Sequence, residues 1–146
     1  MNINETLNFF VNFKKSSNDK SEIKIYDKYI GILSDLKERD LTEKQIKDIE
    51  SELSNLDLES ENHNRKKYYN KKLSEFEKFL KNRLSLILDG HYTFTGMIFG
   101  MMIGCIATFF IGIFSMIGGM IIGMIIGGIM DSEAKKQGRV LKTKVG

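Results

Sequence analysis

The chain has 146 residues, no proline, no tryptophan and a formal net charge of +3. This length allows one modest domain with an appendage but not two full domains, and the lack of proline favours long helices over a turn-rich β-protein. The single cysteine, Cys105, excludes an intrachain disulfide framework and supplies no metal-ligand spacing.

Charge is strongly segregated along the chain. Residues 1–61 carry nine basic and fourteen acidic side chains, and residues 62–88 carry eight basic and two acidic ones. Residues 131–146 carry five basic and two acidic side chains, whereas residues 92–130 contain no charged residue and no histidine. An acidic head with two basic segments around an apolar insert is typical of a membrane protein rather than a nucleic-acid-binding one.

This pattern predicts an all-α membrane protein with four consecutive segments. These are a cytoplasmic helical region (1–61), a basic amphipathic juxtamembrane helix (62–90), a two-span transmembrane hairpin (91–130) and a basic cytoplasmic tail (131–146).

The acidic region contains three amphipathic stretches. Residues 22–37 and 42–57 place apolar side chains at three- and four-residue spacings, and Thr42 with Gln45 forms a capping box. They predict an antiparallel helical pair with coiled-coil-like seams, and residues 3–13 predict a short third helix whose phenylalanines cover the pair. The apolar run of this third stretch is too short for a signal peptide, so we expect the region to stay in the cytoplasm.

Residues 65–88 predict one basic amphipathic helix after a break at 59–64. Lysines occupy one face, and an apolar stripe occupies the other: Tyr69, Leu73, Phe76, Leu80, Leu84 and Ile87. Two arrangements remain open at this point. The helix lies in the membrane interface with its lysines on anionic headgroups, or its stripe packs on the acidic N-terminal helices.

The apolar insert is too long for one span. Its 39 residues would form a helix of about 58 Å, whereas the hydrocarbon core is roughly 30 Å thick. Two spans of about 17–19 residues fit, with the bend expected at residues 110–115, where Gly112 can relax the backbone. A re-entrant loop or a strongly kinked helix is the alternative.

Small residues recur at every fourth position in both predicted spans. Such stripes allow two helices to approach closely, so that van der Waals packing holds them together in lipid. We predict helix–helix contacts at these residues: Gly96, Gly100, Gly104, Thr108 and Gly112 in the first span, and Ser115, Gly119, Gly123 and Gly127 in the second. The stripes can pack the hairpin on itself, join copies of the chain, or do both.

Basic residues flank both ends of the insert, and none lies in the expected turn. The positive-inside rule therefore places both termini in the cytoplasm. We expect the bilayer to contact these side chains through its headgroups: Lys66, Lys67, Lys71, Lys72, Lys78, Lys81, Arg83, Lys135, Lys136 and Arg139.

The GxxxGxxxG repeats of both spans resemble those of small bacterial glycine-zipper two-span membrane proteins. The segment from EFEKFLKNRLSLILDGHYTFTG through MDSEAKKQGRVLK also resembles membrane proteins of Bacteroidota, over about residues 65–143. The resemblance implies a helical hairpin in the bacterial inner (cytoplasmic) membrane and brings no assigned activity. The stretch LKERDLTEKQIKDIESEL (36–53) is similar to the short oligomerisation module called SHOCT, but lacks that module's glycine before the threonine and its phenylalanine after the acidic pair.

The sequence contains no recognisable motif for catalysis, a cofactor or a metal. His63 lies in a polar linker and His91 at the membrane boundary, and neither has a ligand partner at metal spacing. Asp131 and Glu133 close the second span at the level of the headgroups. We therefore expect neither an enzyme nor a nucleic-acid partner.

Two classes of function remain. The first is an anchor that holds a helical interaction or oligomerisation module at the cytoplasmic face of the membrane, as a homo-oligomer or with a cytoplasmic protein partner. The second is an oligomeric pore or membrane-perturbing assembly, a channel or toxin-like effector built by small-residue packing. A water-filled pore needs polar lumen residues, and the candidates are Thr93, Thr95, Thr108 and Ser115.

Overall fold

The computed structural model describes residues 1–60 and 64–145, with the backbone alone at residues 110 and 111. It is 76% helical. The expected linker histidine, His63, lies outside the described residues. Along the chain the elements are α1 (Ile3–Ser16), α2 (Lys20–Lys37), α3 (Glu43–Asn55), α4 (Arg65–Leu84), β1 (Ile87–Asp89), α5 (His91–Ile111), α6 (Phe114–Lys136) and β2 (Val140–Lys144).

These elements form two compact units. The first comprises Met1–Leu86 together with Leu141–Thr143, and it contains the helices α1 to α4. The second comprises Ile87–Val140 and the residues from Lys144 onward, and it contains α5 and α6.

The first three helices begin where side chains satisfy their first backbone N–H groups. Asn2 and Glu5 form a capping box at the start of α1, and Thr42 and Gln45 form the predicted one at the start of α3. Asp19 caps α2 in the same way with its carboxylate. Each such cap contributes about 0.5–2 kcal/mol to helix stability. The three helices predicted from apolar spacing are present, and the first extends beyond its expected end.

The core of the first unit is aromatic. Phe10 and Tyr29 are fully buried and stack with 4.0 Å between their ring centroids. Tyr69 meets both Phe10 and Tyr26 edge to face. The Tyr69 hydroxyl donates to the Leu58 carbonyl at 3.0 Å. The polar end of this buried side chain therefore has a hydrogen-bond partner, while its ring packs among apolar groups.

Helix α4 packs its apolar stripe against this core. Four stripe residues are at most 3% exposed: Tyr69, Leu73, Phe76 and Leu80. Helix α4 contacts α2 and α3. Of the two arrangements left open by the sequence, the structure therefore has the one in which the stripe packs on the N-terminal helices. An ion pair between α2 and α4 joins Lys28 to Glu77 at 3.4 Å. In this pair the lysine belongs to the acidic N-terminal region and the glutamate belongs to the basic helix α4.

The last turn of the predicted helix 65–88 is wrong. Helix α4 ends at Leu84, and Ser85 takes a left-handed conformation (φ 55°) that stops it. Leu86 and Ile87, which are 7% and 4% exposed, then continue in an extended course rather than along the stripe. A left-handed serine costs about 1–2 kcal/mol, and the burial of the two residues that follow opposes this cost.

The sequence predicted no strand, but two short strands pair in parallel. Ile87 of β1 lies opposite Val140 of β2, and Asp89 lies opposite Lys144. Strands of three and five residues are too short to show a reliable alternating pattern, and their pairing depends on the hairpin between them. The architecture is therefore helical with one small sheet.

The end of the chain contributes three residues to the first unit. Leu141 is 1% exposed. The backbone N–H and the hydroxyl of Thr143 both donate to one carboxylate oxygen of Asp35 in α2, each at 2.8 Å. Lys142 pairs with Glu38, and its hydrogen bond lowers the pKa of that exposed carboxyl group. We call these interactions the tail contact.

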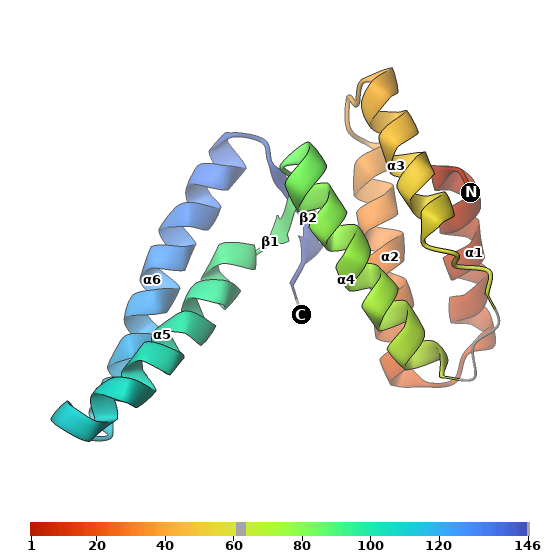
Figure 1. Cartoon of the computed structure of the whole chain (residues 1–146). Coiled ribbons are helices and arrows are strands. Elements are labelled where there is room, and N and C mark those ends of the chain that lie inside the picture. The colour runs from red at the N-terminus through yellow and green to blue at the C-terminus, as the bar shows by residue number, and fades with distance from the viewer. Residues whose placement is uncertain (61–63, 146) are drawn as a thin grey trace. The chain divides into compact units, whose positions relative to one another are not determined.

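In the second unit α5 and α6 form an antiparallel helical hairpin (Figure 1). Helix α5 ends at Ile111, and the following Gly112 has a φ of 95°, a conformation that favours glycine. The turn therefore lies inside the predicted bend at 110–115. Helix α6 continues to Lys136, beyond the expected end of the apolar segment at residue 130.

Candidate functional site

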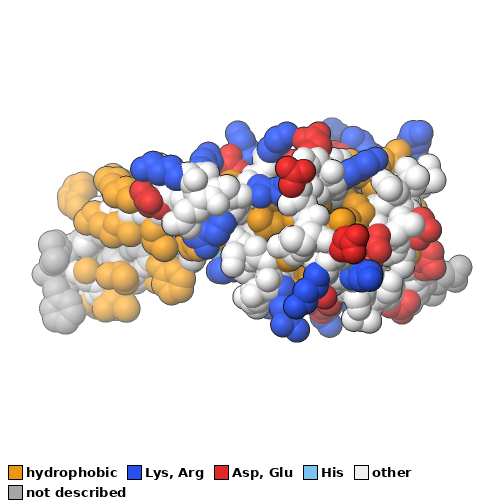
Figure 2. Space-filling view, turned by 90° about the horizontal axis from the view of Figure 1, so that it is seen from above, with side chains coloured by type: hydrophobic (Ala, Val, Ile, Leu, Met, Phe, Trp, Pro, Cys, Tyr) orange, Lys and Arg blue, Asp and Glu red, His pale blue; other side chains and the backbone are white. Residues whose placement is uncertain are grey.

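The outer surface of the hairpin is apolar to a degree that soluble monomers avoid. Isoleucine, methionine and phenylalanine side chains cover it, with Phe109 91% exposed and Phe114 80% exposed. In Figure 2 hydrophobic side chains gather over the hairpin, whereas charged ones cover the helices of the first unit. Contiguous exposed apolar surface marks a site for a membrane or a partner.

Both helices of the hairpin have the dimensions of membrane spans. The segments His91–Phe109 and Phe114–Lys136 are long and apolar enough to cross a bilayer. At most 11% of either apolar window is buried inside the molecule, so both helices are exposed along most of their length.

Between α5 and α6 the glycines lie backbone against backbone. A Cβ added at Gly104 would lie 2.7 Å from Met116 Cα, and one at Gly119 would lie 3.0 Å from Gly104 Cα. One added at Gly123 would lie 3.1 Å from Gly100 Cα and would overlap a carbonyl oxygen of α5. The nearest atoms belong to the backbone and are unable to rotate away. The close approach of the two helices therefore requires glycine at these positions.

The stripe differs at its two ends. Gly96 and Gly127 continue the close approach: a Cβ at Gly96 would lie 3.4 Å from Gly127 Cα, and one at Gly127 would lie 2.7 Å from Thr93 Cα. Gly112, which we predicted to be a helix contact, has no atom within 4 Å of an added Cβ. That residue serves the turn instead, through its positive φ.

Near the turn the two hydroxyl residues of the stripe form a polar cluster. The hydroxyls of Thr108 and Ser115 both donate to the Gly104 carbonyl at 3.0 Å, and they lie 3.2 Å from each other. Ser115 lies 2.8 Å from the Gly112 carbonyl as well. These bonds join α5 to α6 and leave the hydroxyls directed into the hairpin.

At the opposite end Asp131 of α6 caps the N-terminus of α5. Its carboxylate accepts from the backbone N–H groups of Tyr92 and Thr93 at 3.0 and 2.8 Å, and from the Thr93 hydroxyl at 2.7 Å. Gly90, which precedes α5, has no side chain to supply this cap. Asp131 is 5% exposed, so its carboxylate is a buried link between the two helices.

The sequence offered one signal for this role. An acidic residue at the end of an apolar span, with a glycine before the other span, leaves an uncapped helix and a carboxylate with no partner nearby. The predicted hairpin brings these two helix ends to the same side, but the sequence does not give the register that sets Asp131 against the N-terminus of α5.

The predicted headgroup residues fall into two groups. Lys135 pairs with Asp89 at 2.7 Å and Lys136 with Glu133 at 3.1 Å, so both already have anionic partners within the second unit. Arg139 is half-buried, and its carbonyl accepts from Ile87 in the small sheet. The basic residues of α4 lie on its solvent side except for the half-buried Lys72: Lys66, Lys67, Lys71, Lys78, Lys81 and Arg83 are exposed.

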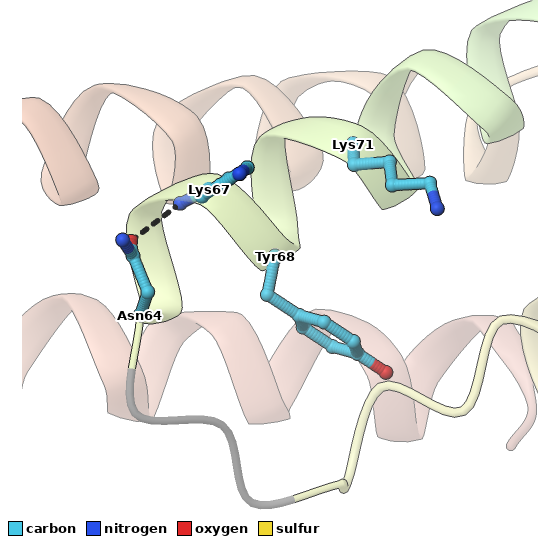
Figure 3. Close-up of a pocket in the computed structure, with 4 residues that line it drawn as sticks. All are labelled: Asn64, Lys67, Tyr68 and Lys71. Carbon is cyan, nitrogen blue, oxygen red and sulfur yellow. Dashed lines mark hydrogen bonds between the residues drawn. The ribbon is translucent and has the colours of Figure 1, made fainter.

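Within residues 1–60 and 64–145 no group of three or more His, Cys, Asp or Glu side chains is placed to hold a metal ion. Cys105 is exposed on the apolar surface of the hairpin. A shallow, open depression at the start of α4 is lined by Asn64, Lys67, Tyr68 and Lys71 (Figure 3). There the Asn64 side chain is used to cap α4, by accepting from the backbone N–H of Lys67 at 3.1 Å.

Comparison with protein-family models, with curated proteins and with solved structures found no match to this chain. The resemblance to glycine-zipper two-span proteins therefore stays a prediction from the sequence.

Proposed function

We propose that this chain is an integral membrane protein in which the hairpin α5–α6 anchors the helical first unit at the membrane. The observation that carries the proposal is the apolar outer surface of two helices of spanning length, over residues with no charge between 92 and 130. A helix satisfies its own backbone hydrogen bonds, so such a pair can lie in lipid where irregular backbone does not.

The tail contact supports a hairpin with both ends on the same side of the membrane. The chain leaves the first unit after Leu86 and returns to it at Leu141, and the whole apolar segment lies between these residues. An odd number of crossings would separate Asp35 from Thr143, which are hydrogen-bonded. The basic residues before and after the spans favour the cytoplasm for this side, and the resemblance favours the bacterial inner membrane.

The polar groups of the spans support an anchor over a pore. A conducting assembly needs polar side chains that face water, yet Thr93, Thr108 and Ser115 bond within the hairpin. Thr95 donates to the carbonyl of His91 in its own helix. We therefore propose the anchor, with a further protein or a second copy as the partner of the first unit.

Membrane extraction and cysteine labelling test the proposal. In bacteria the full chain should stay in the membrane pellet after alkaline carbonate. In a Cys105→Ala background, Ile113→Cys at the turn should react with an impermeant maleimide added outside spheroplasts. Asn18→Cys in the first unit should react only after lysis. Release by carbonate, or labelling of both positions from the same side, would contradict the anchor.

A further inference from the structure

The outward face of α4 carries a straight row of lysines. Its members are separated by four, seven and three positions, spacings that return to the same face of an α-helix. The row, which we call the lysine row, consists of Lys67, Lys71, Lys78 and Lys81. It extends over fifteen residues, with a rise of about 21 Å along the helix axis from the first lysine to the last.

The fold allows this row to act only through charge. The apolar stripe of α4 is buried against the other helices of the first unit, so the helix has no apolar face to insert into lipid. All four lysines are exposed, and Ser74 between them is exposed as well. Glu75 lies beside the row, 4.0 Å from Lys71 and 3.4 Å from Lys72, and Glu77 pairs with Lys28. Four lysines with one neighbouring carboxylate keep the face strongly positive.

The connection to the hairpin determines which anionic partner the row can reach. Residues 85–90 separate α4 from α5, a distance of at most about 20 Å of extended chain. If α5 begins at the membrane, the C-terminal end of α4 at Leu84 is held within this distance of the headgroups. We propose that the lysine row binds anionic phospholipid headgroups and selects membranes that contain them. This inference rests on the proposed membrane anchor.

The size of the effect follows from the charge. Each lysine close to an anionic membrane surface contributes about 1 kcal/mol, which corresponds to about a fivefold change in a binding equilibrium. Four lysines together should change the ratio of membrane-bound to unbound α4 by several hundred-fold between neutral and anionic membranes. Because the attraction is electrostatic, it should weaken as the Debye length falls from about 8 Å at physiological salt to about 3 Å at 1 M.

A fluorescent probe on α4 measures this docking in the full chain. The probe is attached at Ser74→Cys in the Cys105→Ala background, and the protein is reconstituted in phosphatidylcholine vesicles with or without phosphatidylglycerol. A small share of the lipid carries a nitroxide on its headgroup as a quencher. We expect stronger quenching with phosphatidylglycerol, and loss of the difference in high salt.

Matched variants separate the row from charge in general. Replacing the four lysines of the row by glutamine should abolish the lipid-dependent quenching. The control makes the same change of charge on other helices, at four exposed lysines: Lys15, Lys24, Lys44 and Lys47. The control should retain the quenching, and equal loss in both variants would overturn the proposal.

Three further outcomes distinguish the alternatives. Protein that resists carbonate extraction but shows no preference for phosphatidylglycerol would overturn the lipid proposal and leave the anchor intact, whereas protein released by carbonate would overturn both. Binding of an oligonucleotide that is lost in the row variant, without any lipid preference, would overturn the proposal and assign the row to nucleic acid.

Discussion

At Gly123 the absence of a side chain decides how closely α5 and α6 approach. Replacement by leucine should push the backbones apart, because the new Cβ would overlap Gly96 and lie 3.1 Å from Gly100 Cα. We expect the hairpin to lose about 1–3 kcal/mol of stability, as in overpacked cores. Thermal unfolding of the protein in detergent measures the loss.

The control for this change is the neighbouring residue in the same helix. Ile122 is 60% exposed, so Ile122→Leu should leave the unfolding temperature nearly unchanged. Equal effects at both positions would mean that the glycines do not determine the packing.

The buried tyrosines make the first unit sensitive to alkali. Burial raises the pKa of Tyr69 to about 12 against the opposing charge of Arg65, and burial raises the pKa of Tyr29 further. Between pH 10 and about 12 the unfolded chain has therefore lost more protons than the folded one, so the free energy of unfolding falls as pH rises. Below pH 10 this contribution is fully present.

A spectroscopic titration checks this dependence. Tyrosinate absorbance should rise for Tyr29 and Tyr69 only together with the loss of helical circular dichroism. The Tyr69→Phe variant should unfold with a shallower pH dependence, although it loses the hydrogen bond to Leu58. Full ionisation of all tyrosines in a protein that is still helical would contradict the prediction.

The sequence revealed some individual residues well and others poorly. A four-residue glycine spacing needs no tertiary information, so the contacts at Gly100 and Gly104 were predictable from it. The role of Asp131 depends on which residues the antiparallel register brings beside it, and Gly112 required knowledge of where α5 ends. A local pattern identifies the face that a residue occupies but not what lies opposite.

At the level of elements, the tail contact makes α2 depend on the last residues of the chain. Asp35→Ala would leave the N–H and the hydroxyl of Thr143 without their acceptor. An unsatisfied buried polar group costs about 1–3 kcal/mol, and because Thr143 is half-buried, the cost should lie near the lower end of this range. We expect the first unit to lose stability by this amount in denaturant titrations of the full chain in detergent. Circular dichroism measures the unfolding in these titrations.

A matched aspartate on the same helix provides the control. Asp27 forms a surface ion pair with Lys14, and both side chains are nearly half exposed. Such pairs are worth about 0–1 kcal/mol, so Asp27→Ala should have little effect. If the two variants behave alike, the tail does not stabilise the first unit.

The helices were predictable and the strands were not, for a physical reason. Helices α1 to α3 carry their own signals in capping residues and in apolar side chains that recur each turn. The strands β1 and β2 lie about fifty residues apart and form only because the hairpin returns the chain to its starting point. The same return ends α4 early, since Leu86 and Ile87 are buried only in an extended conformation.

For the whole molecule, the sequence predicts self-association, and the hairpin constrains how it can occur. The glycine stripe is occupied inside one chain, so an oligomer has to use another face of the hairpin or the first unit. Gly118, which has open space beside it, lies on such a face. We expect Gly123→Leu to destabilise the hairpin without changing the copy number measured by mass in nanodiscs. A shift to smaller assemblies in that variant would show that the stripe joins separate chains.

The tail contact also imposes an order on the synthesis of the protein. Domains usually fold from the N-terminus while the chain emerges from the ribosome, but here the helical unit lacks Leu141–Thr143 until the residues that follow the apolar segment have been made. The apolar segment between 92 and 130 is therefore made before the first unit can be completed. We therefore expect a chain truncated before residue 141 to contain the whole apolar segment together with an incomplete first unit, which is less stable than the first unit of the full chain.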